Sequence, residues 1–238
     1  MSAPHIENRR RALMRGMLFS APFLLVVAPF ALLFGVVATE AGLNIVEVMG
    51  FSLAVFAGAS QFSALQLMQD QAPTVVVLAT SLAVNLRMGM YSAALTPSLG
   101  RLPLGQRALV AFFLVDQSYA ASVIEFERRP ELTTAERLAF FTGTVLPIAP
   151  AWYVATWMGA VLGTQIPPEY PLDFALPITF IAMIGPMLRT VPHISAALVS
   201  VVGTLALAWM PFSTGVLVAA MIAMLTGAMV EIWMEKRA

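Results

Sequence analysis

The sequence contains no cysteine and carries very little charge. Without cysteine the chain cannot form a disulfide, a thiolate metal site, an iron–sulfur cluster or a cysteine nucleophile. Only 11% of its 238 residues are charged, whereas a soluble domain usually carries about 25%. So few charged side chains could not cover the surface of a water-soluble fold of this size. A soluble enzyme and a disordered chain are therefore excluded.

The sequence also lacks the short motifs of common enzyme classes. HExxH, the phosphate-binding P-loop and GxSxG are absent. Two histidines are too few for a convincing metal site, and no general base is evident beside Ser60 or Tyr119, the hydroxyls an intramembrane enzyme could use. The net charge is zero, so no long-range field draws the chain to nucleic acid. We therefore predict no enzyme, no catalytic residue, no metal, no cofactor and no nucleic-acid partner.

Long apolar stretches dominate what the sequence does contain. Hydrophobic residues make up 59% of the chain and the mean hydropathy is +0.84. Because a membrane helix needs about 20 mostly apolar residues, we predict an all-α helix bundle in the lipid bilayer, built as a single transmembrane domain over residues 1–238. We expect about eight spans, or seven because the sixth and seventh are marginal in length. They cover roughly residues 17–38, 48–69, 73–96, 107–125, 138–162, 173–189, 193–210 and 214–234.

Small residues and prolines predict interruptions in several of these helices. Gly58 and Ser60 lie in the middle of the second span, next to Gln61. They either allow close helix packing, with Gln61 bonding across, or mark an unwound point whose backbone binds a ligand. Proline removes a helical hydrogen bond. Further candidate breaks are therefore Pro147, Pro150, Pro177 and Pro186. Several interrupted spans are typical of a transporter rather than a simple anchor.

The distribution of Lys and Arg predicts the orientation. With both termini in the cytoplasm, residues 1–15 form a basic cytoplasmic tail and ten basic residues face the cytoplasm. They are Arg9, Arg10, Arg11, Arg15, Arg128, Arg129, Arg137, Arg189, Lys236 and Arg237. Only Arg101 and Arg107 fall outside, and both flank the same loop. A re-entrant second or third span would move that loop inside.

Two charges, Arg87 and Asp116, lie within predicted spans, where each costs about 2.5–3.5 kcal/mol on insertion scales. Counted along straight helices, their depths differ by about one turn. They can form a structural ion pair, hold the two ends of a zwitterion, or make no contact. Arg87 suits a planar carboxylate and Tyr91 shares its helix face, whereas Asn85 adds polarity to the neighbourhood but points elsewhere on the helix. Asp116 suits an ammonium group or a transferred proton.

Three segments, residues 56–62 (FAGASQF), 85–87 (NLR) and 116–120 (DQSYA), resemble the AzlC family of branched-chain amino acid permeases. The resemblance covers essentially the whole chain. It implies an exporter of leucine, isoleucine, valine and sometimes methionine, driven by the proton motive force in the bacterial inner membrane. It also implies a small membrane partner of the AzlD type. The chain departs from the family at Gln117, where an acidic residue is common, and at Met88, where histidine or an aromatic residue is common.

The residues and the resemblance together suggest one mechanism. Arg87 engages the substrate carboxylate, assisted by Gln61 or by backbone amides at Gly58 and Ser60, with Asn85 and Tyr91 close by. Asp116 engages the ammonium group or exchanges a proton. Two alternatives remain at this point: a permease for another small zwitterionic or neutral solute, and a membrane assembly subunit that does not transport.

Overall fold

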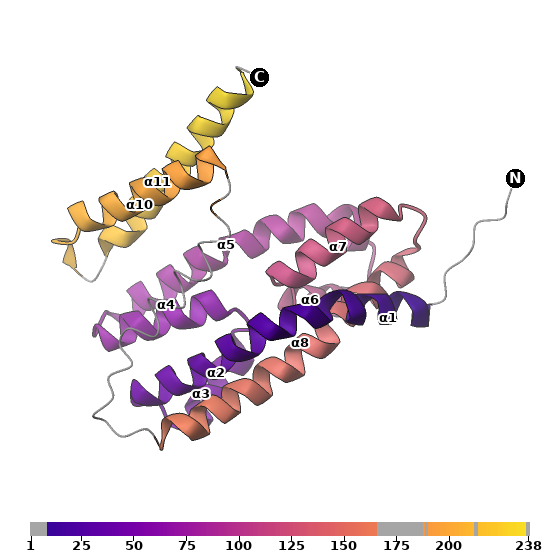
Figure 1. The fold of residues 1–238 in the computed structure, drawn as a ribbon, viewed down its shortest axis with the longest axis horizontal. Helices are drawn as coiled ribbons and strands as arrows, with labels where there is room; N and C mark the ends of the chain where they lie inside the picture. Colours follow the sequence, from indigo (N-terminus) through magenta and orange to yellow (C-terminus); the bar gives the residue numbers. More distant parts are fainter. Residues whose placement is uncertain (1–8, 166–187, 189, 212–213, 237–238) are drawn as a thin grey trace, which may run out of the picture. The chain divides into compact units, whose positions relative to one another are not determined.

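The computed structural model describes residues 9–165, 188, 190–211 and 214–236, and within these ranges it contains helices and no β-strand (Figure 1). The predicted all-α membrane class, with interrupted helices, is therefore confirmed. The chain divides into two compact units. The first comprises Met1–Gln61 and Leu82–Pro167, and the second comprises Phe62–Ser81 and Pro168–Ala238. The single domain over residues 1–238 stays a prediction.

The helices in chain order are α1 (Arg9–Ser20), the 3-10 turn η1 (Ala21–Phe23), α2 (Leu24–Glu40), α3 (Ile45–Ala54), α4 (Gly58–Gln69), α5 (Thr74–Leu99), α6 (Leu104–Phe112), α7 (Asp116–Arg128), α8 (Thr134–Gly163), α10 (Val191–Ala206) and α11 (Thr214–Glu235). In the part of the chain that is described, four helices are long and apolar enough to cross a membrane, or five if the bent pair α6–α7 counts as one span. The predicted sixth span, 173–189, lies outside the described residues except for Leu188. The total of eight spans stays a prediction.

Two long rods form the framework of the first unit: α1–α2, which continues through η1 from Arg9 to Glu40, and α8. They run parallel and meet at glycines. Gly16 faces Gly143, and Gly35 faces Gly159 further along. A Cβ atom on Gly35 would collide with the carbonyl oxygen of Thr156. Small residues at these positions let the two backbones touch, which is how helices associate in lipid.

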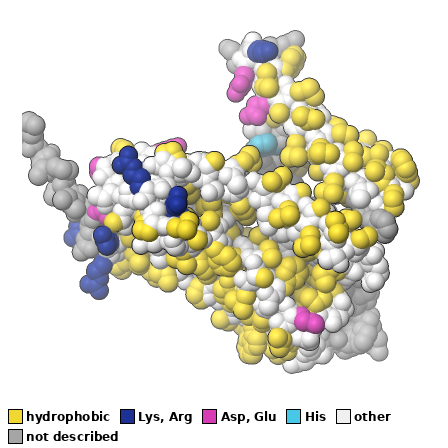
Figure 2. Space-filling view, turned by 180° about the vertical axis from the view of Figure 1, so that it is seen from behind, with side chains coloured by type: hydrophobic (Ala, Val, Ile, Leu, Met, Phe, Trp, Pro, Cys, Tyr) yellow, Lys and Arg dark blue, Asp and Glu magenta, His cyan; other side chains and the backbone are white. Residues whose placement is uncertain are grey.

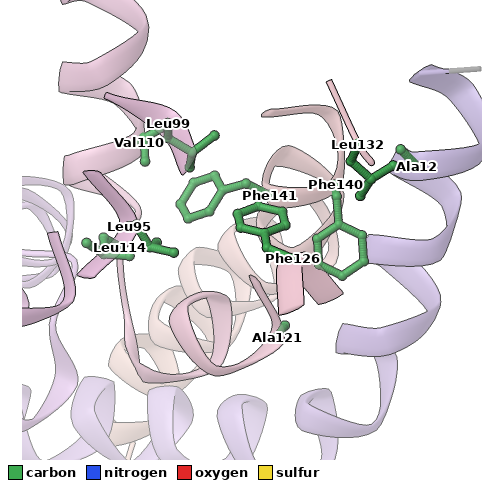
Figure 3. Close-up of a cluster of buried hydrophobic side chains, with 10 residues drawn as sticks. All are labelled: Ala12, Leu95, Leu99, Val110, Leu114, Ala121, Phe126, Leu132, Phe140 and Phe141. Carbon is green, nitrogen blue, oxygen red and sulfur yellow. The ribbon is translucent and has the colours of Figure 1, made fainter. Parts of the chain in front are cut away.

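Aromatic side chains fill the interior of the first unit in two clusters. One joins α1, α5, α6, α7 and α8 around Phe126, Phe140 and Phe141 (Figure 3). The other joins α2, α3 and α8 around Trp152, whose indole N–H donates to the Ser52 hydroxyl at 2.8 Å. The first cluster lies close to where α8 begins, and the second lies deeper along α8.

Within the second unit, α10 and α11 pack as an antiparallel pair. A Cβ on Gly203 would lie 3.1 Å from the Ala219 side chain, and one on Gly227 would lie 3.2 Å from that of Ala196. Large apolar side chains on the outside of both helices, such as Leu205 and Leu225, remain exposed, as expected for helices that face lipid.

Some predicted interruptions are wrong and an unexpected one is present. α8 continues without a break through Pro147 and Pro150. The predicted continuous helix over residues 107–125 is instead two helices, α6 and α7, whose axes differ by 119° across residues 113–115. The second predicted span is interrupted, but at residues 55–57, so Gly58 begins α4 rather than lying in the unwound segment. Pro177 and Pro186 lie outside the described residues.

Candidate functional site

Arginines mark one end of the first unit. Arg15 on α1 forms an ion pair with Glu125 near the end of α7. Arg137 on the first turn of α8 donates to the Ser98 hydroxyl, near the end of α5, at 2.9 Å. These contacts bring together the starts of α1 and α8 and the ends of α5 and α7. We call this the arginine end, and Figure 2 shows its basic side chains at the left of the first unit.

The candidate site is an ion pair between α5 and α7. The Arg87 Nη1 atom lies 3.0 Å from the Asp116 Oδ2 atom. This contact was one of the sequence-based alternatives, and the alternative without contact is wrong. The side chains of Arg87 and Asp116 are 30% and 43% exposed. The Asp116 carboxylate and the Arg87 guanidinium are only partly buried in the first unit. Both are therefore accessible to a small ligand.

Two tyrosines complete the site. The Tyr91 hydroxyl donates to the Asp116 Oδ1 atom at 2.9 Å, so both carboxylate oxygens of Asp116 are engaged. Because Tyr91 follows Arg87 by four residues, one face of α5 carries both groups, as predicted. The Tyr91 ring stacks on the Tyr119 ring with centroids 4.1 Å apart. Tyr119 was missed as a site residue, although its position three residues after Asp116 puts it on the same face of α7.

The local structure around Asp116 explains why α7 begins there. The Ser118 hydroxyl accepts the Val115 N–H at 3.0 Å and lies at 3.0 Å from the Phe113 carbonyl oxygen, to which it can donate. It thereby satisfies backbone groups that the interruption releases from helical bonding. Asp116 is the first residue of α7, where the positive end of the helix dipole favours a carboxylate. The sequence signal for this break is the Asp-Gln-Ser order rather than a proline or a glycine.

Three other predicted site residues, Gly58, Ser60 and Gln61, lie at the start of α4, directly after the interruption between α3 and α4. The Gln61 side-chain amide donates to the Val55 carbonyl oxygen, and the Gln61 side chain is fully buried. Ser60 is also buried, and a Cβ on Gly58 would collide with the Phe30 and Trp152 rings. In this conformation Gln61 therefore stabilises the interruption, and its described hydrogen bond is not to Arg87 or Asp116. Gly58 and Ser60 form the first turn of α4, which carries positive partial charge.

The two interruptions touch through aromatic rings. Phe56, between α3 and α4, packs edge-on against Phe113, between α6 and α7, with centroids 5.3 Å apart. Phe112 lies against the same ring at 6.4 Å. The first turns of α4 and α7 therefore adjoin one aromatic cluster. An arrangement of this kind can present an apolar surface beside positive helix ends and an Arg–Asp pair.

Two polar atoms of α5, on different faces of the helix, have no hydrogen-bond partner among the described residues. They are the Asn85 Oδ1 atom and the Arg87 Nε atom, and both are shielded from solvent. Buried polar groups normally have a partner. A bound polar solute could supply one at this position. In the described residues no group of His, Cys, Asp and Glu is arranged to hold a metal ion.

These observations define a helical membrane protein with a charged site beside interrupted helices, an architecture consistent with a membrane permease. Residues 22–166 match the AzlC protein family, so the chain belongs to the AzlC family. Among similar proteins, an uncharacterized membrane protein of Archaeoglobus fulgidus is 29% identical over 197 residues, covering 81% of this chain and 83% of that protein. The inner membrane protein YgaZ of Escherichia coli is 28% identical over 177 residues, covering 72% of this chain and 71% of that protein. No solved structure matches the chain.

Proposed function

We propose that this protein is a secondary transporter that exports leucine, isoleucine and valine, with methionine as a fourth candidate substrate. The proton motive force drives export, and a small AzlD-type membrane subunit works with it. The substrate class and the partner rest on the family. The Escherichia coli relative's description as an inner membrane protein supports the same location here. The arginine end then faces the cytoplasm, because Lys and Arg accumulate on that side.

The observation that carries the proposal is the accessible contact between Arg87 and Asp116. Removing one partner of this pair would leave the other charge uncompensated within a membrane-spanning segment, where a lone charge costs about 2.5–3.5 kcal/mol on insertion scales. A zwitterionic amino acid avoids this cost, because its carboxylate replaces Asp116 at the guanidinium and its ammonium replaces Arg87 at the carboxylate. The site can therefore open for this solute while both charges stay neutralised.

The surroundings of the pair suit the rest of an aliphatic amino acid. The Arg87 Nε atom is available for a further hydrogen bond to the polar end of the solute. Phe56, Phe112 and Phe113 form an apolar cluster at the two interruptions, where a branched side chain can be held by contact alone. Aromatic and aliphatic walls discriminate weakly between side chains that differ by one methylene, which agrees with several related substrates.

Asp116 also offers a route for proton coupling. Protonation would remove its charge and weaken its attraction to Arg87, while the Tyr91 hydroxyl could reorient from donor to acceptor. Loss of the proton restores the pair. One carboxylate can thus alternate between holding Arg87 and carrying a proton, and a cycle of this kind couples solute release to proton movement.

The test is efflux of leucine, isoleucine, valine and methionine from preloaded cells that express the chain with and without an AzlD-type subunit. Arg87→Ala and Asp116→Asn should each reduce efflux at least about tenfold, because each removes a charged partner worth about 1.5–3 kcal/mol. Arg128→Ala is the matched control, since Arg128 is exposed at the arginine end. Normal efflux by Arg87→Ala and Asp116→Asn would refute the assignment.

The observed ion pair also favours the second candidate, an assembly subunit in which Arg87 and Asp116 only hold α5 against α7. The double variant Arg87→Asp with Asp116→Arg separates the two functions. For a purely structural pair the exchange should restore folding and assembly relative to the two single variants, although not fully, because the first turn of α7 favours a carboxylate. A substrate site with defined geometry and coupling would fold after the exchange and lose efflux.

A further inference from the structure

We infer that α6 and α7 form a re-entrant hairpin that enters the membrane from the arginine end, carries Asp116 to Arg87, and returns to the same end. The 119° bend between the two helices admits either a broken span or a re-entrant loop. The choice depends on where the outer ends of α6 and α7 lie. This inference concerns the path of the chain and holds whichever solute is transported.

The outer end of α7 lies at the arginine end. Glu125, in its last turn, forms an ion pair with Arg15 of α1 and lies 3.4 Å from the Arg129 Nε atom. The ring of Phe126 next to it packs against that of Phe140 near the start of α8, with centroids 6.2 Å apart. These contacts hold the last turn of α7 against the second turns of α1 and α8.

The outer end of α6 lies at the same place. Only four residues separate the end of α5 at Leu99 from the start of α6 at Leu104, and Ser98 accepts a hydrogen bond from Arg137 of α8. On the second turn of α6, Arg107 borders a small cavity of about 70 Å³ together with Thr96 of α5. α6 therefore starts where α7 finishes, and the chain reverses between them.

Helix lengths agree with a hairpin that penetrates partway. At roughly 1.5 Å per residue, the 9 residues of α6 rise about 13 Å and the 13 residues of α7 about 20 Å, against an apolar core of about 30 Å. Non-helical backbone at this depth requires burial in protein. Leu114 is buried, Ser118 bonds to backbone atoms of the interruption, and Phe113 packs on Phe56.

The positions of Arg101 and Arg107 at the arginine end differ from the sequence-based prediction. They were predicted outside because three crossing spans were counted before their loop, and only a re-entrant second or third span was expected to move that loop inside. In the hairpin they join the other arginines of residues 9–163 at one end. Those at the arginine end are then Arg9, Arg10, Arg11, Arg15, Arg101, Arg107, Arg128, Arg129 and Arg137, and the remaining one is Arg87. A single bent span would instead place Arg107 and Arg128 on opposite sides.

The absence of cysteine makes the test direct. Gly105→Cys and Arg128→Cys probe the two arms of the hairpin, and a Cβ at Gly105 would lie in open space. Arg9→Cys reports the arginine end, and Val46→Cys reports the opposite end of the first unit, where the side chain is 81% exposed. Each variant is treated with a membrane-impermeant maleimide on intact cells and on inside-out vesicles, with detergent-solubilised samples confirming that each cysteine reacts.

We expect positions 9, 105 and 128 to react from one side and position 46 from the other. Reaction of positions 105 and 128 from opposite sides would overturn the hairpin. If the first three react on intact cells, the hairpin stands and only the cytoplasmic orientation in the proposed function fails. Efflux is measured on the same variants. A failure of the proposed transport function can therefore be distinguished from a failure of the hairpin.

A second observation, a cavity of about 500 Å³ at the arginine end, carries a separate inference. We propose that this cavity binds the phosphate of an anionic phospholipid. Arg9 of α1 and Arg101, between α5 and α6, line it, and no acidic side chain is among its lining residues. Thr134 at the positive N-terminal end of α8 also borders it. Two guanidinium groups beside a helix start suit a phosphate.

Most of the remaining wall of this cavity is apolar, with Gln106 and Thr142 as its polar members, and an apolar wall favours a lipid over a soluble anion. Leu13, Leu102 and Leu138 contribute to it. A phospholipid could place its phosphate between Arg9 and Arg101 and rest the start of an acyl chain on the leucines. Bound in this way, it would link α1 to the segment that leads into α6.

The experiment measures thermal unfolding of the purified full chain in detergent with phosphatidylglycerol, phosphatidylcholine or inorganic phosphate added. Phosphatidylglycerol should raise the midpoint by roughly 2–4 °C more than phosphatidylcholine. The double variant Arg9→Gln with Arg101→Gln should lose this difference, and Arg128→Gln should keep it. Equal stabilisation by both lipids, equal loss in Arg128→Gln, or an equal effect of inorganic phosphate would overturn the lipid site.

Discussion

Two regions of the first unit differ in how their helices respond to sequence. α8 contains Pro147 and Pro150, yet it stays helical over 30 residues. The segment from α6 to α7 contains no proline, yet it reverses through 119° within three residues. Local helix propensity alone would assign these behaviours the other way round.

The difference lies in what each segment contacts. α8 packs along its length against α1–α2 over glycines, and this contact outweighs the hydrogen bonds that the prolines remove. Between α6 and α7, the Ser118 hydroxyl serves the released backbone groups and Phe113 packs on Phe56. Tertiary contacts therefore decide where helices in this membrane protein continue and where they end.

The largest effect on stability is expected at the close contact between α8 and α2, which keeps α8 helical. A Cβ at Gly159 would collide with the carbonyl oxygen of Leu32, a backbone atom that cannot move away on its own. Gly159→Ala should destabilise the protein by about 3 kcal/mol or more and reduce the monodisperse yield in size-exclusion chromatography. Gly105→Ala on α6, where a Cβ meets nothing within 4 Å, is the matched control and should be neutral or slightly stabilising. Equal yields of the two variants would contradict the close approach.

The second-largest effect on stability is expected for Ser118, whose hydroxyl bonds to the backbone where α7 begins. Ser118→Ala removes the acceptor of the Val115 N–H at the interruption, which should cost about 1–2 kcal/mol and lower the thermal midpoint. Ser122→Ala is a closely matched control, because Ser122 is also buried on α7 but its hydroxyl bonds only within the helix, to the Ser118 carbonyl. Similar losses for both variants would show that Ser118 has no special part in the interruption.

The sequence predicted the charged site better than the path of the chain. Arg87 and Asp116 were placed at similar depth, with an ion pair as one of three alternatives, and Tyr91 was placed beside Arg87 by helical spacing, because charges in a membrane have few alternatives to each other. The capping box of Thr133 with Glu136 at the start of α8 is likewise encoded locally and is present. The reversal between α6 and α7 was missed, because residues 113–115 contain no proline or glycine and the Asp-Gln-Ser order at residues 116–118 was not recognised as a helix start. It depends on Phe56, which lies more than fifty residues earlier in the chain.

A smaller effect distinguishes the two tyrosines of the site. Tyr91→Phe removes the hydrogen bond to Asp116 while keeping the ring stacked on Tyr119, so efflux should fall about fivefold, corresponding to roughly 1 kcal/mol. Tyr119→Phe preserves both the stack and the bond from Tyr91 to Asp116, and it should transport normally. A loss of similar size in both variants would show that the effect does not come specifically from the hydrogen bond between Tyr91 and Asp116.

The smallest expected effect concerns the prolines of α8. Pro147→Ala and Pro150→Ala each restore an N–H donor to a segment that is already helical, so stability should change by no more than about 1 kcal/mol and efflux should be unchanged. This result would place the functional interruptions of the first unit at residues 55–57 and 113–115 alone. If either variant folds with normal stability but loses efflux, α8 must bend at these prolines during transport. The continuous α8 helix would then be only one of its conformations during transport. α8 and α6–α7 would differ in the conformation seen here but not in function.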